Sequence, residues 1–492
     1  MNSPILRSLF DGLTLDALAE RAVYLQLADV ILSFIRNGKL QPRQKLPGSR
    51  EAAGWLGINR ITVSRAYDEL CTQGWLESAV GRGTFVSAHI PEPGPGVLTE
   101  IRVPAPLKEA GFSVQTDSFL LNQYSGRTAG LHLDDGLADP ELTPLKELYR
   151  AYRNQMTRSG FYGKFGYYAE PEGSDLYRGA LSSYLNDTRG LRTSPKNILS
   201  VRGALMGLNL VCNGLITPGD VVVSGVPGWN KAELNFRHAR AKHLTVPVDK
   251  HGLVTEELKK ICRREKVRMV YVTPHHHYPT TVALRIDRRL ELLQLANDYG
   301  FIIFEDDYDF DFHYRHRPLF PLASADGNGM VIYCGSFSKN FSPAFRMGYL
   351  VAAENVISHL AKIRVLIDRQ GDHLLDNALA ELLNDGTIQR YIRKALPVYT
   401  ERRDLLGDLL RSELKEKVRF TVPEGGLTIW TEFDRSVHLE TLAQKAYRKG
   451  LFISNGTLHQ YPRYNANAIR LGFASSSGED LIKSISILKE LM

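Results

Sequence analysis

A lysine follows the short apolar segment at residues 331–334, with two serines just before it and an arginine soon after it. The run reads SFSKNFSPAFRMG over residues 336–348, an SxSKxxxPxxRxG pattern whose fixed positions include Ser336, Ser338, Lys339 and Arg346. A lysine amine that loses its proton attacks an aldehyde to form a Schiff base, and hydroxyls with an arginine can hold a phosphate beside it. The pattern therefore predicts a site for a compound that carries both groups. The alternative is a solvated lysine in a serine-rich loop.

Pyridoxal 5'-phosphate (PLP) carries both groups, and the run resembles the cofactor-lysine segment of fold-type-I aminotransferases. A second motif supports this resemblance, because the apolar residues 301–304 lead into Glu305, Asp306, Asp307 and Tyr308. The carboxyl end of a buried strand is where α/β sheets bind ligands, and an acid there can pair with the pyridine nitrogen of PLP. The family's acid stands 33 residues before the lysine, as Asp306 does here.

By the same resemblance, Tyr308 hydrogen-bonds the ring hydroxyl of the cofactor. Glu305 and Asp307 are then expected to be structural or to face solvent in the following loop.

Four further segments match the aminotransferase family. Gly203 and Ala204 open a helix whose N–H groups can bind phosphate, although the family commonly has Gly-Ser-Gln where this chain has Gly-Ala-Leu. The resemblance implies that Trp229 covers the cofactor ring, with a buried core tryptophan as the alternative. It also implies that Arg470, in an NxxRLGF motif, binds a substrate carboxylate, and that Tyr168, in YxxPxG, reaches the phosphate of a neighbouring subunit. A site shared in this way implies a homodimer.

Residues 273–281 read TPHHHYPTT and are similar to the family's TPxHQxPTG. Here His277 replaces the usual glutamine and Thr281 replaces a glycine, which puts the backbone path of a tight turn in question. Three consecutive histidines also suggest a metal site. We expect none, because consecutive side chains rarely converge and no carboxylate or cysteine flanks them.

The first ninety residues have a different pattern. Apolar residues at helical spacing predict helices over residues 24–36, 50–56 and 60–73, with Ser49 and Asn59 as N-caps of the second and third. Two short strand-like segments, at 75–78 and 84–86, flank the glycine-containing turn 81–83 and predict a hairpin. A helix-turn-helix followed by a hairpin wing is a DNA-binding arrangement.

Basic residues concentrate in this region. Residues 36–65 contain seven lysines and arginines and one acid, which favours a polyanionic partner over a merely solvated face. Residues 46–86 resemble the winged helix-turn-helix of GntR-type regulators along almost their whole length. The resemblance implies contacts to double-stranded DNA from the following residues: Arg50, Arg60, Thr62, Arg65 and Gly83 at the wing tip. For each arginine alone, an exposed helix charge remains the alternative.

Composition sets the outer limits. The chain has 492 residues, 43% of them hydrophobic, and a net charge of +7, which is typical of a globular protein with more than one domain. Its four cysteines are far apart, no segment resembles a signal peptide, and no window is apolar enough to span a membrane, so we expect a cytoplasmic protein. A Pro- and Gly-rich segment beginning at residue 90 predicts a linker. We expect a DNA-binding domain at 1–88, a linker at 89–125 and a PLP- and effector-binding domain at 126–492.

The large domain alternates helical segments with apolar strands, which indicates an α/β fold with a mostly parallel sheet. A winged helix-turn-helix, mainly α, ahead of such an aminotransferase-like domain resembles the MocR/GabR-type transcriptional regulators. Members of that family respond to amines such as γ-aminobutyrate or taurine, or to PLP itself. The resemblance implies a PLP-dependent regulator that senses a small amine or amino acid by Schiff-base exchange on Lys339.

Two alternatives stay open. One is an active aminotransferase with an appended DNA-binding domain, or a regulator that retains part of that reaction. The other is a DNA-binding protein whose large domain is a PLP-free dimerisation scaffold.

Overall fold

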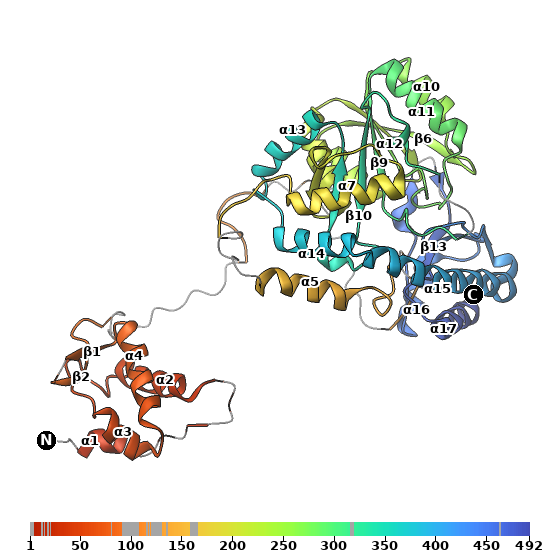
Figure 1. The fold of residues 1–492 in the computed structure, drawn as a ribbon. Coiled ribbons are helices and arrows are strands. Elements are labelled where there is room, and N and C mark those ends of the chain that lie inside the picture. The colour runs from red at the N-terminus through yellow and green to blue at the C-terminus, as the bar shows by residue number, and fades with distance from the viewer. Residues whose placement is uncertain are drawn as a thin grey trace. The chain divides into compact units, whose positions relative to one another are not determined.

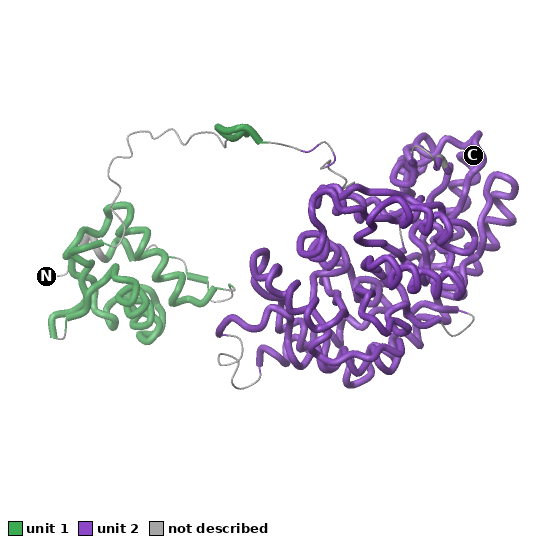
Figure 2. Tube along the Cα trace, turned by 90° about the horizontal axis from the view of Figure 1, so that it is seen from above, with its two compact units in different colours: residues 1–115 green, residues 116–492 purple. Residues whose placement is uncertain are grey.

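The computed structural model describes residues 4–10, 13, 15, 16, 19, 21–79, 81–90, 108–114, 117, 119, 130–133, 136–157, 166–314, 319–461 and 464–492. The chain divides into two compact units, residues 1–115 and 116–492, coloured separately in Figure 2. Most of the predicted linker at 89–125 lies outside the described residues, so the predicted domain boundaries stay predictions. No helix in the described ranges is long and apolar enough to cross a membrane.

Unit 1 is a small helical domain with a hairpin. Its elements are α1 (Pro4–Phe10), α2 (Val23–Arg36), α3 (Ser49–Leu56), α4 (Arg60–Thr72), β1 (Leu76–Ala79) and β2 (Gly83–Val86). Helix α4 buries one stripe at helical spacing, and β1 pairs antiparallel with β2. The buried side chains of the three longer elements α2, α3 and α4 form one core with those of the hairpin. This is the predicted helix-turn-helix with a wing.

The helix caps agree with the sequence in one case and differ in the other. Asn59 caps α4, since its side chain accepts a hydrogen bond of 2.8 Å from Ile61 N. The prediction that Ser49 caps α3 is wrong, because the helix already begins at Ser49 and Gly48 occupies the cap position without a side-chain bond.

Unit 2 is built on an eight-stranded sheet in the order β4-β11-β10-β9-β8-β5-β6-β7. The strands are β4 (Ile198–Val201), β5 (Val221–Val226), β6 (Lys242–Asp249), β7 (Gly252–Leu253), β8 (Val267–Val272), β9 (Ile302–Asp307), β10 (Val331–Ser336) and β11 (Gly348–Val351). The central pairs from β10 to β6 are parallel, and β11 and β7 run antiparallel to their neighbours. The prediction of a mostly parallel sheet is confirmed.

Helices pack on this sheet, as Figure 1 shows. They are α5 (Leu145–Thr157), α7 (Asp175–Arg189), α8 (Gly203–Leu215), α9 (Asn230–His238), α10 (Thr255–Cys262), α11 (Ile286–Tyr299), α12 (Leu322–Ala325), α13 (Glu354–Val365) and α14 (His373–Asn384). The central strands are buried almost throughout, which explains why their sequences read as unbroken apolar runs.

The C-terminal part forms a smaller layer with its own core. It contains α15 (Thr387–Leu409), α16 (Leu439–Arg448), α17 (Gly478–Leu491) and the antiparallel sheet β12 (Val418–Phe420), β13 (Thr428–Phe433) and β17 (Ala468–Gly472). Two-stranded pairs join β14 (Leu451–Ile453) to β3 (Leu131–Leu133) and β15 (Gln460–Tyr461) to β16 (Tyr464–Asn465). Strand β17 carries Arg470 towards the carboxyl ends of the large sheet, where the site lies.

Candidate active site and DNA-binding face

A cavity of about 220 Å³ lies where β8, β9 and β10 end and α8 begins, and we call it the cofactor cavity. Its lining residues are Ala204, Leu205, Trp229, Tyr271, Tyr278, Asp306, Tyr308, Ser336, Ser338, Lys339, Arg346 and Arg470. The structure thus brings together nine of the residues predicted from sequence. Gly203 and Tyr168 are not among the lining residues.

Lys339 follows the end of β10 and extends into this cavity. Its Nζ donates a hydrogen bond to the carbonyl oxygen of Gly136. The turn that carries the lysine is fixed by Ser336, whose Oγ accepts a 3.1 Å bond from Ser338 N and donates to Met347 O at 3.3 Å. A backbone carbonyl thus holds the lysine amine, and the two hydrogen bonds of Ser336 hold the turn that carries the lysine.

One end of the cavity has the composition of a phosphate site. Ser338 Oγ is buried and, within the described ranges, has no hydrogen-bond partner. Arg346 Nη2 donates to Arg202 O at 3.1 Å, beside the first turn of α8. Gly203 has a φ of 77°, which favours glycine, and a Cβ there would lie 2.7 Å from Arg346 Nη2 and displace the guanidinium. Helix N-terminal N–H groups, a hydroxyl and a guanidinium are suited to a dianion.

The other end of the cavity presents an acid. Asp306 is 4% exposed, and its Oδ2 accepts a 2.7 Å hydrogen bond from Tyr271 Oη. Its Oδ1 is buried and has no partner among the described residues. Burial raises the pKa of Asp306 to about 7, the Tyr271 hydrogen bond lowers it, and the charges of Asp307 and Asp309 raise it. A cation placed at Oδ1 would favour the ionised form.

The two acids beside Asp306 are buried, so the solvent-facing alternative is wrong for both. Glu305 accepts hydrogen bonds from Leu322 N (2.8 Å) and Ala323 N (2.9 Å). Asp307 accepts one of 2.6 Å from Tyr333 Oη. These contacts tie β9 to α12 and β10, which supports the structural reading.

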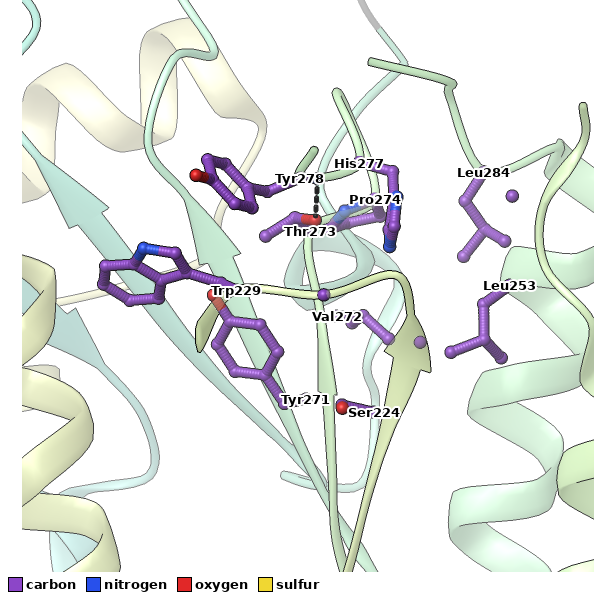
Figure 3. A pocket seen from close by; sticks show the side chains of 13 residues that line it. Ser224, Trp229, Leu253, Tyr271, Val272, Thr273, Pro274, His277, Tyr278 and Leu284 are labelled. Carbon is purple, nitrogen blue, oxygen red and sulfur yellow. Dashed lines mark hydrogen bonds between the residues drawn. The ribbon is translucent and has the colours of Figure 1, made fainter. Parts of the chain in front are cut away.

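Aromatic side chains form one wall. Figure 3 draws a smaller pocket that shares the rings of Trp229, Tyr271 and Tyr278 with the cofactor cavity; the three rings lie on the left of the view, and Leu253 and Leu284 lie on the right. The Trp229 and Tyr278 ring centroids are 6.5 Å apart in an edge-on arrangement. Trp229 is half-buried: it lines the cavity and also packs against the core beside α8, so its role in covering a planar ligand stays a prediction.

Arg470 closes the side of the cavity that faces the smaller layer. It is 4% exposed, its Nη1 donates to Pro279 O at 3.1 Å, and its guanidinium lies 4.6 Å from the Tyr278 ring centroid. It also lines a second cavity of about 570 Å³. A buried guanidinium in this position can bind an anionic group of a ligand.

The side chains of His275, His276 and His277 bond to different parts of unit 2 and do not meet at one point. The ring nitrogens have three separate partners: Leu319 O for His275 (2.6 Å), Asp309 Oδ1 for His276 (2.7 Å) and Thr280 Oγ1 for His277 (2.8 Å). No group of three or more metal-ligating side chains lies together in the described part of the chain. Tyr308 Oη donates to His276 O at 2.9 Å, so the segment also fixes that tyrosine.

Thr281 has a φ of 62°, in the left-handed region that favours glycine. The backbone is therefore strained at a β-branched residue.

Tyr168 lies on the surface of unit 2, 77% exposed, with the Arg369 guanidinium 4.6 Å from its ring centroid. Its predicted role in a neighbouring subunit is tested by nothing in a single chain and stays a prediction.

The predicted DNA-contact residues belong to α3, α4 and β2 of unit 1. Arg50, Arg60, Arg65 and Gly83 are exposed and Thr62 is half-buried. Arg60 begins α4 and its Nε donates a 3.4 Å hydrogen bond to Ser49 Oγ. The opposite stripe of α4 is buried, so the helix presents its basic first turn outward.

Sequence reasoning missed two lining residues of the cofactor cavity, Tyr271 and Tyr278, and the hydrogen-bond partner of Lys339, Gly136. Tyr271 lies in an apolar strand, where a buried hydroxyl that needs a partner was the available signal. Tyr278 stands at a variable position of its motif, and Gly136 is distant in sequence, so neither had a local signal.

The fold and site define a class: a winged helix-turn-helix joined to a fold-type-I aminotransferase domain. Residues 144–486 match the family model for aminotransferase class I and II, and residues 23–86 match that of bacterial regulatory proteins of the gntR family. The sequence is 32% identical over 475 residues to the uncharacterised HTH-type transcriptional regulator YdfD of Bacillus subtilis, covering 94% of each chain. It is 27% identical to the probable rhizopine catabolism regulatory protein MocR of Rhizobium meliloti, covering 97% of this chain and 95% of that one.

Unit 2 is also similar to a solved enzyme structure. LysN, an α-aminoadipate aminotransferase of Thermus thermophilus complexed with N-(5'-phosphopyridoxyl)-L-leucine, matches with a TM-score of 0.68 and 26% identity, over 74% of this chain and 92% of that one. The chain belongs to the aminotransferase class I and II family and, with its GntR region, to the MocR-type HTH transcriptional regulators.

The family assignment supports PLP as the cofactor, and the residues present fit it. The open Oδ1 of Asp306 suits a pyridine N–H, and the open Oγ of Ser338 suits a phosphate oxygen. Lys339 Nζ and the Trp229 ring line the same cavity.

Proposed function

We propose that this protein is a DNA-binding transcriptional regulator that holds PLP on Lys339 and senses a small amine or amino acid by Schiff-base exchange at that lysine. The main support is that Lys339, Asp306 and Arg346 line one cavity in a chain that also carries a GntR region. When bound, PLP supplies an aldehyde carbon that reacts with amines and a ring that withdraws electrons.

The chain's own residues would divide the work of binding. Asp306 Oδ1 accepts a hydrogen bond from the pyridine nitrogen, and Tyr308 bonds the ring hydroxyl. Ser336, Ser338, Arg346 and the first N–H groups of α8, from Gly203 and Ala204, hold the phosphate.

Arg470 would take part in effector binding and Tyr168 in the assembly of a homodimer. Arg470 binds the carboxylate or sulfonate of an effector, because its buried guanidinium lines the same cavity as Lys339. Tyr168 completes the phosphate site of a second copy in a homodimer, which its exposure on unit 2 permits.

DNA binding would use the exposed basic face of unit 1. Arg60, Thr62 and Arg65 reach base edges and phosphates from the start of α4, Arg50 meets phosphate from α3, and Gly83 brings the wing close to the backbone. Exchange at Lys339 changes the affinity of this face for the operator.

A spectral titration of the purified protein with a panel of amines and amino acids tests the proposal. We expect a visible absorption band from the bound cofactor that shifts with one class of amine, and the same amine to change operator affinity in a gel-shift assay. An amine that shifts the band and leaves DNA affinity unchanged would contradict the sensing role. Absence of any cofactor band would instead favour the PLP-free scaffold.

An active aminotransferase is the second candidate. It is favoured by the cavity itself, which contains lysine, acid, tyrosine and both arginines together. Multiple-turnover amino transfer between an amino acid and a 2-oxo acid distinguishes an enzyme from a sensor that exchanges once per binding event.

A further inference from the structure

Two consecutive acids on β9 are each held by a tyrosine hydroxyl from a neighbouring strand. Tyr271 Oη, on β8, donates to Asp306 Oδ2 at 2.7 Å. Tyr333 Oη, on β10, donates to Asp307 Oδ2 at 2.6 Å. Both pairs share this hydrogen bond, but Tyr333 Oη also accepts one of 3.1 Å from Arg189 Nε, and only Asp306 of the two acids lines the cofactor cavity.

The pleat of the sheet separates the pairs. Tyr271 lies beside Phe304 in the β8–β9 register, so it shares a face with Phe304 and Asp306. Tyr333 lies beside Glu305 in the β9–β10 register and shares the opposite face with Asp307. Tyr271 and Asp306 both line the cavity, whereas Tyr333 packs in the core formed with α7 and α14.

We infer that Tyr271 is a positioning residue for the cofactor: by donating to Asp306 Oδ2 it fixes the carboxylate so that Oδ1 faces the pyridine nitrogen. This inference rests on the proposed function, in which PLP occupies the cavity. Asp306 Oδ1 is buried without a partner in the described ranges, while Oδ2 is occupied. A carboxylate free to rotate would present either oxygen at variable angle.

Packing fixes the tyrosine itself. Tyr271 is 5% exposed, and its ring stacks on Phe304 with centroids 5.8 Å apart and meets Phe236 edge-on at 6.0 Å. The hydroxyl can therefore reach Asp306 and has little freedom to bond elsewhere. Burial and the neighbouring carboxylate hold the pKa of Tyr271 well above its usual value, so the hydroxyl keeps its proton.

The hydrogen bond also favours the charged form of the acid. The pKa of Asp306 is raised to about 7 by burial and by the charges of Asp307 and Asp309, with the Tyr271 hydrogen bond opposing them. The other groups that interact with this pair are Cys334 of β10 and Tyr308, both neutral while protonated. Losing the hydroxyl should raise the pKa of Asp306 further, because the donor that stabilises the carboxylate is gone.

The test compares Tyr271→Phe with Tyr333→Phe, each of which removes one buried hydroxyl from a tyrosine–aspartate pair. PLP affinity is measured from pH 6 to 9 on protein stripped of cofactor, with thermal unfolding as a check on folding. For Tyr271→Phe we expect at least about a tenfold weaker affinity at pH 7, the size of one hydrogen bond to a charged group. The pH at which affinity rises should also move upward, because Asp306 must ionise to pair with the ring nitrogen.

Tyr333→Phe should lose about as much thermal stability as Tyr271→Phe. Its PLP affinity should stay within about twofold of the wild-type value, and the pH profile of that affinity should not move. In an Asp306→Asn background, Tyr271→Phe should have little further effect on PLP affinity, which a general packing defect would not reproduce.

Equal effects of the two Tyr→Phe changes, or an unmoved pH profile in Tyr271→Phe, would overturn the inference and leave the proposed function standing. A wild-type chain that binds no PLP would overturn both.

Discussion

At the scale of single residues, the site depends on a few side chains with unsatisfied or strained geometry. Asp306 Oδ1 and Ser338 Oγ are buried donors or acceptors with an open position, and Thr281 has a left-handed backbone that favours glycine. Such features persist where function or the surrounding structure requires them. Two predictions concern these residues and their neighbour Arg470.

Thr281→Gly should stabilise unit 2 by roughly 1 kcal/mol, because glycine adopts a φ of 62° without the strain of a β-branched side chain. Urea unfolding measures the change. Thr280→Gly is the matched control and should destabilise, since Thr280 Oγ1 bonds His277 Nδ1 at 2.8 Å. Loss of stability in Thr281→Gly would mean that the threonine side chain contributes more than its backbone strain costs.

Arg470→Ala should weaken the binding of carboxylate and sulfonate effectors by about 1.5 to 3 kcal/mol, the range for hydrogen bonds to charged groups. The binding of simple amines should not change. The spectral titration of the wild type and the variant with paired ligands, an amino acid and its decarboxylated amine, measures this. An equal loss for both members of a pair would make Arg470 structural.

At the scale of elements, strand β9 concentrates three buried acids in a row. Burial raises the pKa of Glu305 to about 8, and those of Asp306 and Asp307 to about 7. Taken alone, these three acids make the folded state bind more protons than the unfolded state between about pH 4 and 8, so their contribution to stability falls as the pH rises through that window. The buried His243, His275, His277 and His313 have lowered pKa values, and their contribution to stability rises with pH up to about pH 7.

We expect the free energy of unfolding of cofactor-free protein to decline from about pH 7 to pH 8.5, where unfolded histidines are already neutral and the acids still lose protons. Asp306→Asn should make the decline shallower, because one titrating group is removed. Urea unfolding at each pH measures it. Added PLP should offset part of the decline, since its ring nitrogen pairs with the ionised Asp306. A stability that rises with pH over this range would show that the acids are ionised in the folded state.

We propose helix α4 as the element that contacts DNA bases. Arg60→Ala should weaken the free energy of operator binding by about 1 to 3 kcal/mol, since Arg60 begins the helix and can contact a base edge. The difference in affinity between the operator and random DNA should therefore become smaller. Arg50→Ala, on α3, should weaken both DNAs alike and lower the salt slope by about one. Titrations of both variants at several salt concentrations decide it, and two indistinguishable profiles would remove the assignment of separate roles.

The elements show what sequence could and could not predict. Periodicity identified α2, α4 and the central strands, because their apolar faces are continuous in the chain. Motif spacing identified Lys339, Asp306 and Arg346, since Asp306 lies at the carboxyl end of β9 and the other two follow β10. Tyr271 and Gly136 escaped because their partners, Asp306 and Lys339, are far away in sequence and only the folded sheet brings them together. The exposure of Glu305 and Asp307 was open for the same reason: their burial depends on α12 and β10.

At the scale of the whole molecule, one chain contains both a basic helix-turn-helix unit and a unit with a cofactor cavity. Regulation requires that the ligand at Lys339 bind one state of the protein better than another, because equal affinity for both would shift nothing. The lysine is the residue through which such a preference would act, while the core of unit 1 is separate and should fold without it.

The most direct measurement is operator affinity with and without the effector amine, in the wild type and in Lys339→Ala. We predict that the amine changes the wild-type affinity several-fold, and that Lys339→Ala binds the same operator with normal affinity, shows no visible cofactor band and does not respond. A Lys339→Ala protein whose DNA affinity still responds to the amine, or that still forms a reducible covalent adduct with PLP, would contradict the central claim.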